Sequence, residues 1–315
     1  MQSPQTGLVY GDIFLRHDTG PDHPERPARL TAIVARLRDG GLMDRLVVLP
    51  FEPVPPDQLT SVHPAAYVER VRQTCAQGAL WLDDLDTCIC SESYDVARSA
   101  VGGVLAAVDA VAQGRVRNAF CAVRPPGHHA LPERAMGFCL FNNVAIAARH
   151  AQSKHDLRKV LIVDWDVHHG NGTQHVFYTD PTVLYFSVHQ YPHYPYTGSA
   201  SETGADEGVG LTVNAPLPAG SGDEAFIAAF REKLLPAALA FRPDLVLISA
   251  GFDAHRGDPI AGMAMTAEGY AELTRITKNI AETCCEGRIV SVLEGGYGLE
   301  GLAESVEAHL RVLME

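Results

Sequence analysis

The stretch Val160–Asp164, VLIVD, is apolar up to its final aspartate, and the stretch 244–251, DLVLISAG, is apolar between its first and last few residues. A strand without alternating polar and apolar residues is buried on both faces, as strands of a parallel sheet are. Both stretches lead into charged, small or glycine residues, where a strand would leave the sheet. They therefore predict a parallel sheet at the centre of the protein.

Similar apolar runs alternate with longer helical patterns along the chain. We predict strands at Gly7–Tyr10, Leu46–Leu49, Ala119–Val123, Val160–Asp164, Val183–Val188, Leu211–Asn214, Leu245–Ser249 and Ile289–Leu293. We predict helices at Arg26–Asp39, Pro64–Gln77, Ser91–Gln113, Phe138–Gln152, Asp223–Phe241, Thr266–Cys284 and Leu299–Leu313. This alternation favours a doubly wound α/β sheet. Without a repeat or a linker, we expect one domain over residues 1–315, in which the irregular stretch Gln190–Gly210 is a functional or disordered loop.

The composition is that of a folded protein, with 46% hydrophobic and 20% charged residues. The formal net charge of −13 argues against nucleic acid and anionic membranes as partners and is compatible with cationic substrates. The seven cysteines show no C-x-x-C spacing, which favours free thiols in a reducing compartment. We find neither a signal peptide nor an apolar run of about 20 residues that could span a bilayer. We expect a cytoplasmic protein without membrane contacts, and a homo-oligomer is compatible with the sequence.

Four of the predicted strands lead into polar motifs. These motifs are RPPGHHA at 124–130, DWDVHHGNG at 164–172, AGFDAHRGDP at 250–259 and LEGGYG at 293–298. In open parallel sheets the active site forms at the carboxyl ends of the strands. The motifs should therefore bring histidines, carboxylates and a tyrosine to one edge of the sheet.

The segment Asp164–His168 is the most informative of these strand ends. If it stays extended, Asp164, Asp166 and His168 share one face. Asp166 and His168, joined by Asp253, would form a set of three ligands, and catalytic zinc sites use three protein ligands and keep one position open. A single strand end of this kind could equally be a loop that caps helices. The four motifs together favour the metal site.

Two histidines and one tyrosine are candidates for proton transfer and charge stabilisation. His128 and His129 would form the acid–base pair that an activated water and a departing amine require. Tyr297, between glycines, is suited to donate a hydrogen bond to a developing oxyanion. A tyrosine flanked by glycines is often a plain turn residue, so this motif is weak when taken alone.

Five motifs in chain order carry a family resemblance. RPPGHHA, GFCLFNN, DWDVHHGNGTQ, SAGFDAHRGDP and LEGGY closely resemble the class II histone deacetylases and their bacterial homologues. The resemblance runs from about His17 nearly to the end of the chain. It implies an arginase-like α/β fold with a central eight-stranded parallel sheet, and zinc-dependent hydrolysis of N-acyl amides.

The resemblance also implies roles for individual residues. It assigns Asp166, His168 and Asp253 as zinc ligands, His129 as general base and acid, His128 as its electrostatic partner, and Tyr297 as the residue that polarises the carbonyl. Many family members also bind potassium near the zinc, which would lie among Asp164, Asp166, His168, Ser187 and Val188. Asp164 and Asn171 are expected to lie next to the metal ligands and catalytic histidines. Asn171, typical of class II, should leave His129 less basic than the aspartate of class I would.

Further positions correspond to the substrate tunnel of the family. Gly137 and Phe138 match one wall, Tyr194 lies near the position of the opposite wall, and Asp86 resembles a rim aspartate that holds a peptide backbone. The binuclear manganese enzymes of the same fold place additional aspartates beside the first ligands. Here those positions are Gly170 and His255, so one divalent ion is expected.

Three functions are compatible with these residues. Acyl-lysine deacylation of a peptide or small molecule is the leading interpretation. The first alternative is acetylpolyamine hydrolysis, whose eukaryotic class II enzymes carry glutamate in G-D-P-x, where this chain has Ile260. The acidic residues Asp83, Asp84 and Asp86 could instead attract a polyamine. The remaining alternative is a non-catalytic module that binds acyl ligands.

Overall fold

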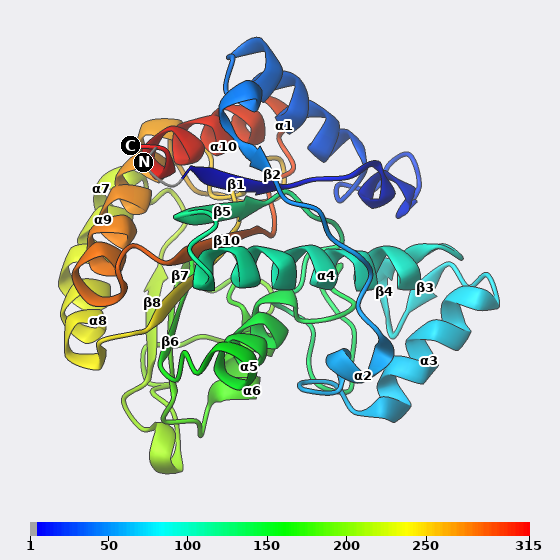
Figure 1. The fold of residues 1–315 in the computed structure, drawn as a ribbon, viewed down its shortest axis with the longest axis horizontal. Coiled ribbons are helices and arrows are strands. Elements are labelled where there is room, and N and C mark those ends of the chain that lie inside the picture. Colours follow the sequence, from blue (N-terminus) through cyan, green and yellow to red (C-terminus); the bar gives the residue numbers. More distant parts are fainter. Residues whose placement is uncertain (1–4) are drawn as a thin grey trace.

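The computed structural model describes residues 5–315, so the first four residues of the expected domain lie outside the described part. Eight parallel strands form one sheet (Figure 1). They are β1 (Thr6–Val9), β2 (Val47–Val48), β5 (Asn118–Cys121), β6 (Val160–Asp164), β7 (Val183–Gln190), β8 (Thr212–Leu217), β9 (Leu245–Ala250) and β10 (Ile289–Leu293). Each coincides with a predicted strand to within a few residues, and the expected α/β fold with an eight-stranded parallel sheet is confirmed.

The strand order is β2-β1-β5-β10-β9-β6-β7-β8, so β5, β10, β9 and β6 are neighbours at the centre. Every residue of these four strands is buried, which explains their continuous apolar sequences. In register, Asp164 of β6 lies opposite Ser249 of β9 and Ser187 of β7. The four strands that lead into the polar motifs therefore end side by side.

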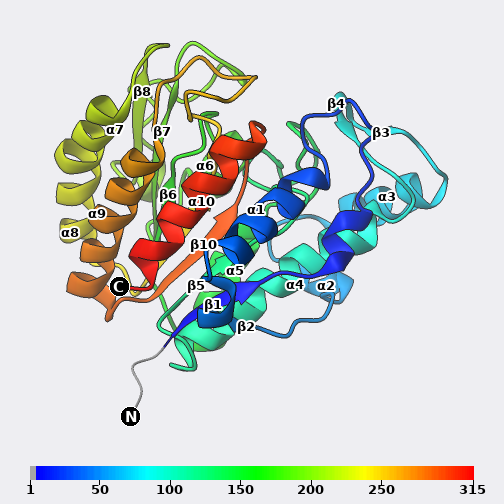
Figure 2. The same ribbon diagram turned by 90° about the horizontal axis from the view of Figure 1, so that it is seen from above.

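Helices cover both faces of the sheet (Figures 1 and 2). One layer contains α1 (Ala28–Asp39), α7 (Asp223–Ala229), α8 (Leu235–Phe241), α9 (Ala267–Cys285) and α10 (Leu299–Leu313). The opposite layer contains α4 (Ser93–Ala112), α5 (Asn143–His155) and α6 (Asn171–Phe177), and α2 (Pro56–Leu59) and α3 (Ala65–Ala76) lie beside it. Alanine, valine and glycine dominate α4, of which fifteen residues are buried, so it packs closely against its neighbours.

The short helices α2 and α6 and the 3-10 turns were not predicted, and the structure departs from the predicted elements at three further places. The helix expected from Phe138 begins at Asn143, because Phe138 has a φ of 68° and Asn142 caps the helix by accepting a hydrogen bond from the Ala145 amide. The helix predicted over 223–241 contains a π-helical segment, Phe230–Leu234, just before Pro236, which lacks an amide hydrogen. A short antiparallel hairpin, β3 (Trp81–Leu82) and β4 (Asp84–Cys88), was not predicted.

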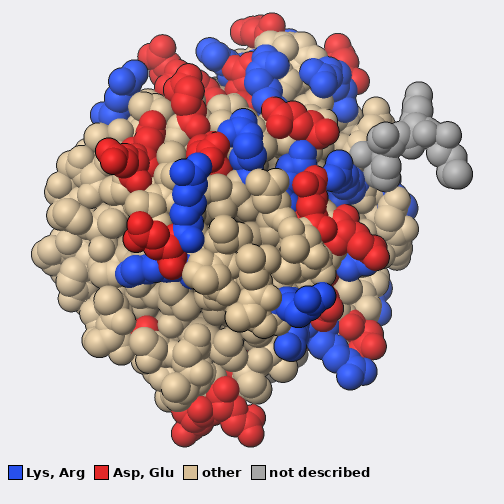
Figure 3. All heavy atoms as spheres, turned by 90° about the vertical axis from the view of Figure 1, so that its left-hand side faces the viewer, with Lys and Arg blue, Asp and Glu red and all other residues tan. Residues whose placement is uncertain are grey.

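The cysteines agree with the expectation of free thiols, and the charged side chains of one face are mixed in sign. Acidic and basic side chains are interspersed on the face shown in Figure 3 rather than separated into regions of one sign. All seven cysteines are free thiols. Among the helices that the structure describes, none has both the length and the apolar character needed to cross a membrane.

Candidate active site

The carboxyl ends of β5, β10, β9 and β6 open into one pocket of about 220 Å³. The residues predicted for catalysis and substrate binding meet here. The predicted residues that line it are Asp86, His128, His129, Gly137, Phe138, His168, Tyr194, Ile260 and Tyr297. Because these residues come from six separate parts of the sequence, the sheet topology is what assembles the pocket.

Asp166, His168 and Asp253 form a buried cluster whose ligand atoms lie within 4.8 Å of one another. His168 Nδ1 is 3.0 Å from Asp166 Oδ1 and 3.3 Å from Asp253 Oδ2. Backbone amides fix the two carboxylates, because Val167 donates to Asp253 Oδ1 over 2.8 Å and Gly295 donates to Asp166 Oδ2 over 2.7 Å. The cluster therefore offers one imidazole nitrogen and two carboxylate oxygens at a single point.

This donor set fits a divalent metal ion. Asp253 Oδ2 is buried, and no residue in the range 5–315 donates a well-aligned hydrogen bond to it, although His168 Nδ1 lies 3.3 Å away. Burial, with Asp166 adding to it, raises the pKa of Asp253 to about 7. A carboxylate oxygen left without a donor in the interior is costly, and a cation compensates that cost. Two carboxylates and one imidazole are typical ligands of zinc, and three protein ligands leave a position for substrate.

Glycines allow the backbone to approach this cluster. A β-carbon on Gly295 would collide with the Asp253 carboxylate, and one on Gly251 would collide with Asp166. Both glycines belong to the motifs found in the sequence, in LEGGY and SAGFD. Glycine is therefore required at both positions, because any larger residue would collide with the two carboxylates.

His128 is held by a carboxylate behind the pocket. Its Nδ1 lies 3.0 Å from Asp164 Oδ2, which also accepts a hydrogen bond from the Tyr185 hydroxyl at 3.1 Å. Burial opposes ionisation of His128, but Asp164 and Asp166 together raise its pKa to about 10. A positively charged His128 is therefore expected beside His129, whose ring centroid is 4.0 Å away.

His129, unlike His128, is expected to be neutral. Burial lowers its pKa well below the usual value, and the charges on His128 and His168 lower it further. Its Nδ1 lies 2.8 Å from Asn171 Oδ1. An amide oxygen accepts a hydrogen bond, so Nδ1 carries the proton and Nε2 is the basic nitrogen. A neutral imidazole in this form can accept a proton.

Tyr297 is positioned by two residues that the sequence analysis did not identify. Asp258 Oδ2 accepts hydrogen bonds from the backbone amides of Tyr297 at 2.7 Å and Gly298 at 3.1 Å. The Arg29 guanidinium lies 4.9 Å from the centre of the Tyr297 ring and donates to the Gly296 carbonyl over 2.6 Å. Burial raises the pKa of Tyr297 well above its usual value, so the phenol stays a hydrogen-bond donor. Asp258 belongs to the HRGDP motif, whereas no sequence pattern singled out Arg29.

Aromatic rings form the walls of the pocket. Phe138 packs edge-to-face against Tyr297, with centroids 5.8 Å apart, and against His23 at 4.7 Å. Tyr194 lies 5.2 Å from the His129 ring, and His193 stacks on His168 at 5.1 Å. His23 and His193 were not predicted as site residues, although His193 lies in the loop 190–210 that its length marked as functional. The walls suit an extended apolar chain.

The three acidic residues at the rim differ in whether an arginine neutralises them. Asp83 pairs with Arg70, and Asp84 pairs with Arg134 at 2.6 Å. Asp86 lines the pocket, and its Oδ1 accepts a hydrogen bond from the Thr87 hydroxyl at 2.9 Å. Two of the three acidic residues considered for a polyamine are thus neutralised by arginines.

The residues of the expected potassium site also lie together. Asp164 and Ser187 are partners in register on β6 and β7, and Val188 follows on the same strand. Both oxygens of Asp164 accept hydrogen bonds, one from the Asp166 amide at 3.2 Å and one from Tyr185. Ser187 Oγ lies 2.9 Å from His189 Nδ1. An ion here would therefore depend mainly on backbone carbonyls.

Known proteins resemble the chain over nearly its whole length. The histone deacetylase domain matches residues 23–313. A probable deacetylase of Archaeoglobus fulgidus is 44% identical over 299 residues, covering 94% of this chain and 82% of that protein. Polyamine deacetylase HDAC10 of Homo sapiens is 46% identical over 98% of this chain, which spans 48% of that protein. The crystal structure of the HDA15 HD domain has a TM-score of 0.94 and 41% identity, covering 99% of this chain and 90% of that one.

These similarities confirm the resemblance that the five motifs indicated. The matching relatives are named deacetylases, which hydrolyse amide bonds, and their family is zinc-dependent. The expected enzyme class is therefore confirmed as well. The chain belongs to the histone deacetylase family and is a hydrolase of amide bonds.

Proposed function

We propose that this protein removes acetyl or other acyl groups from lysine-type amines, with one zinc ion held by Asp166, His168 and Asp253. The observation that carries the proposal is the buried cluster with an undonated Asp253 oxygen, next to a neutral His129 in an aromatic-walled pocket. Such a pocket suits the four-carbon stem of an acyl-lysine. The test is acetate release from an acetyl-lysine peptide compared with acetylspermidine, and a clear preference for the polyamine would contradict the proposed substrate.

The chain's own residues supply the remaining chemistry. A zinc ion held by Asp166, His168 and Asp253 would supply Lewis acidity toward the carbonyl and toward the attacking water. Nε2 of His129 accepts a proton from that water and returns it to the departing amine. The hydroxyl of Tyr297 donates a hydrogen bond to the carbonyl oxygen as its negative charge develops. His128, held by Asp164, keeps a positive charge near the reacting carbonyl.

Replacing Asn171 with aspartate should move the acidic limb of the pH profile. The new carboxylate would lie beside His129 Nδ1, where Asn171 Oδ1 is now 2.8 Å away, and would favour the protonated imidazole. Raising the pKa of His129 by about one unit or more would shift the acidic limb of kcat/KM to higher pH by the same amount. The measurement is kcat/KM between pH 5.5 and 9. An unchanged limb would exclude His129 as the base.

The pocket favours acyl-lysine over acetylpolyamine. Ile260, at the position where polyamine-selective relatives carry glutamate, lines the pocket and offers no charge to a second ammonium. Asp83 and Asp84 are paired with arginines, which leaves Asp86 as the free carboxylate of the three. The 46% identity to a protein named polyamine deacetylase keeps acetylpolyamine hydrolysis as the second candidate.

Replacing Ile260 with glutamate should shift this selectivity. A carboxylate at the pocket would attract the distal ammonium of acetylspermidine. We expect the ratio of kcat/KM for acetylspermidine to that for acetyl-lysine to rise on the order of tenfold, equivalent to about 1.4 kcal/mol. The matched control is Ile260→Gln, which has similar size without charge and should leave the ratio nearly unchanged. Equal ratios in both variants would show that this position does not read charge.

Two further features belong to the same proposal. The chain forms one catalytic domain, and a potassium ion binds near Asp164, Ser187 and Val188. The register of β6 and β7 supports the ion by placing Asp164 beside Ser187.

A module that only binds acyl ligands is disfavoured, because the positions needed for proton transfer and oxyanion stabilisation are all filled. Zinc binding without turnover of any acyl substrate would favour it instead.

A further inference from the structure

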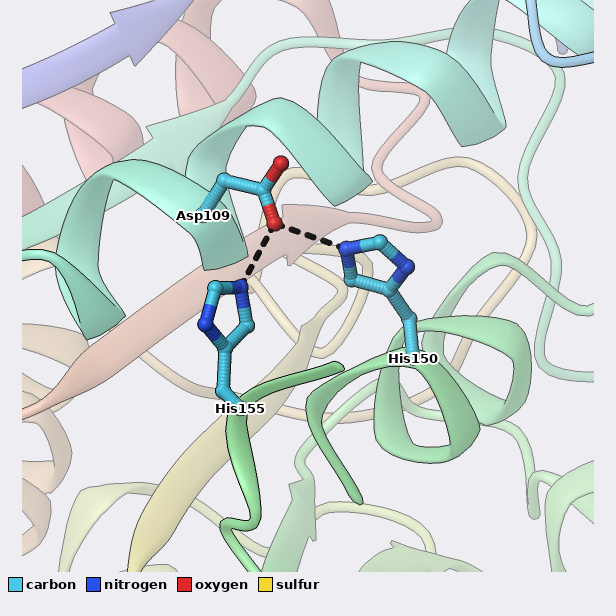
Figure 4. Close-up of side chains that lie close together, drawn as sticks. All are labelled: Asp109, His150 and His155. Atoms are coloured by element: carbon cyan, nitrogen blue, oxygen red, sulfur yellow. Dashed lines mark hydrogen bonds and ion pairs between the residues drawn. The ribbon is translucent and has the colours of Figure 1, made fainter. Parts of the chain in front are cut away.

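A second cluster of metal-ligating side chains lies on the helical layer formed by α4 and α5. It consists of Asp109 of α4 and His150 and His155 of α5, which point toward one another (Figure 4). Their ligand atoms all lie within 4.8 Å of one another. None of the three lines the active-site pocket, so the cluster needs its own explanation.

The two histidines converge on one oxygen atom. Nε2 of His150 and Nε2 of His155 are each 2.7 Å from Asp109 Oδ1, and the ring centroids are 5.9 Å apart. The side chains are mostly buried, with 13% of each imidazole and 20% of the carboxylate exposed. Both nitrogens and the carboxylate oxygen therefore face a common point.

The surrounding backbone also favours a cation. Asp109 lies in the last turn of α4, which ends at Ala112, and His155 is the final residue of α5. Carbonyl groups at helix C-termini carry partial negative charge. Lys154 Nζ is 2.7 Å from Asp109 Oδ2, so it holds the second carboxylate oxygen and leaves Oδ1 to the histidines. In metal sites, outer hydrogen bonds of this kind orient the ligands.

We propose that Asp109, His150 and His155 bind a second zinc ion, which joins α4 to α5 and is separate from the catalytic ion. Two imidazoles and one carboxylate are typical zinc ligands, and a water molecule would complete a tetrahedral site. Ligand atoms around tetrahedral zinc are about 3.3 Å apart, given bonds of about 2.0–2.1 Å. The present contacts of 2.7 Å would therefore open slightly through side-chain torsions. The nearby Lys154 charge makes this site weaker than the catalytic one.

Zinc stoichiometry tests the proposal. The full chain, freed of any tag and stripped with a chelator, would be dialysed against buffered Zn²⁺ and its metal content measured. The wild type should bind two equivalents, and His155→Gln should bind one while keeping its amide hydrolase activity. Asp253→Asn, which removes a ligand of the other cluster, should also bind one. Lys154→Gln, the control from the same turn, should keep both.

A second variant and a second measurement distinguish loss of the zinc site from misfolding of the variant. Asp109→Asn should likewise lose one equivalent, and zinc beyond the first equivalent should raise the Tm of the wild type but not of His155→Gln. A single equivalent in the wild type would overturn the proposal. Two equivalents retained by both His155→Gln and Asp109→Asn would overturn it as well. Neither result depends on the proposed deacylase activity.

Discussion

His129→Ala should lower kcat by about 10²- to 10⁴-fold, the usual contribution of a general acid–base group. The variant would lose the neutral imidazole whose tautomer is fixed by Asn171 at 2.8 Å. The proposed zinc ligands remain, because His129 is not one of the three clustered residues. The measurement is single-turnover and steady-state release of acetate, together with zinc content and thermal stability.

The matched control for this change is His175→Ala. His175 lies on α6, is exposed, and does not line the active-site pocket. Its removal should leave kcat within about twofold of the wild type, as is usual for surface positions. Full turnover by folded, zinc-loaded His129→Ala would contradict the role proposed for His129.

Tyr297→Phe should lower kcat by about 10²- to 10³-fold, the effect of removing one oxyanion donor. The ring would keep its contacts with Phe138 and Arg29, so the fold and the pocket shape should survive. KM should change less than kcat, because the lost hydrogen bond strengthens as charge develops on the carbonyl oxygen. Steady-state kinetics on the zinc-loaded variant provide the measurement.

Tyr194→Phe removes a hydroxyl from the same pocket and serves as the control. Within the described chain, the Tyr194 hydroxyl has no hydrogen-bond partner, and no catalytic role is proposed for it. Its removal should therefore have a small effect on kcat. Equal losses in Tyr194→Phe and Tyr297→Phe would indicate that pocket polarity, rather than oxyanion stabilisation, explains the effect.

Much of the fold was predictable because its strands are buried on both faces. The run VLIVD matches β6 residue for residue, and all eight predicted strands belong to the sheet. Their order was not available from periodicity, because pairing is decided by contacts between distant segments. The predicted start of α5 at Phe138 was too early for a local reason. The apolar segment from Phe138 forms a pocket wall and a loop, and the helix begins only after Asn142, which caps it.

The site was predictable to the extent that its residues lie in compact motifs at strand ends. Asp166, His168 and Asp253 were found in this way, and the structure clusters them. Arg29 and Asp258 act on the backbone around Tyr297, and only the fold brings Arg29 next to a segment more than 250 residues away. The cluster of Asp109 with two histidines of α5 escaped notice for the same reason, because its members share no motif.

Turnover of an acetyl-lysine peptide by metal-free protein, before and after zinc is restored, tests directly whether the buried cluster is the catalytic metal site. We expect chelation to abolish acetate release and zinc to restore it in the wild type and in His155→Gln. Zinc should not restore it in Asp253→Asn, which lacks one carboxylate of the buried cluster. Full acetate release by the metal-free wild type, or by Asp253→Asn, would contradict the assignment of a zinc-dependent deacylase site to Asp166, His168 and Asp253.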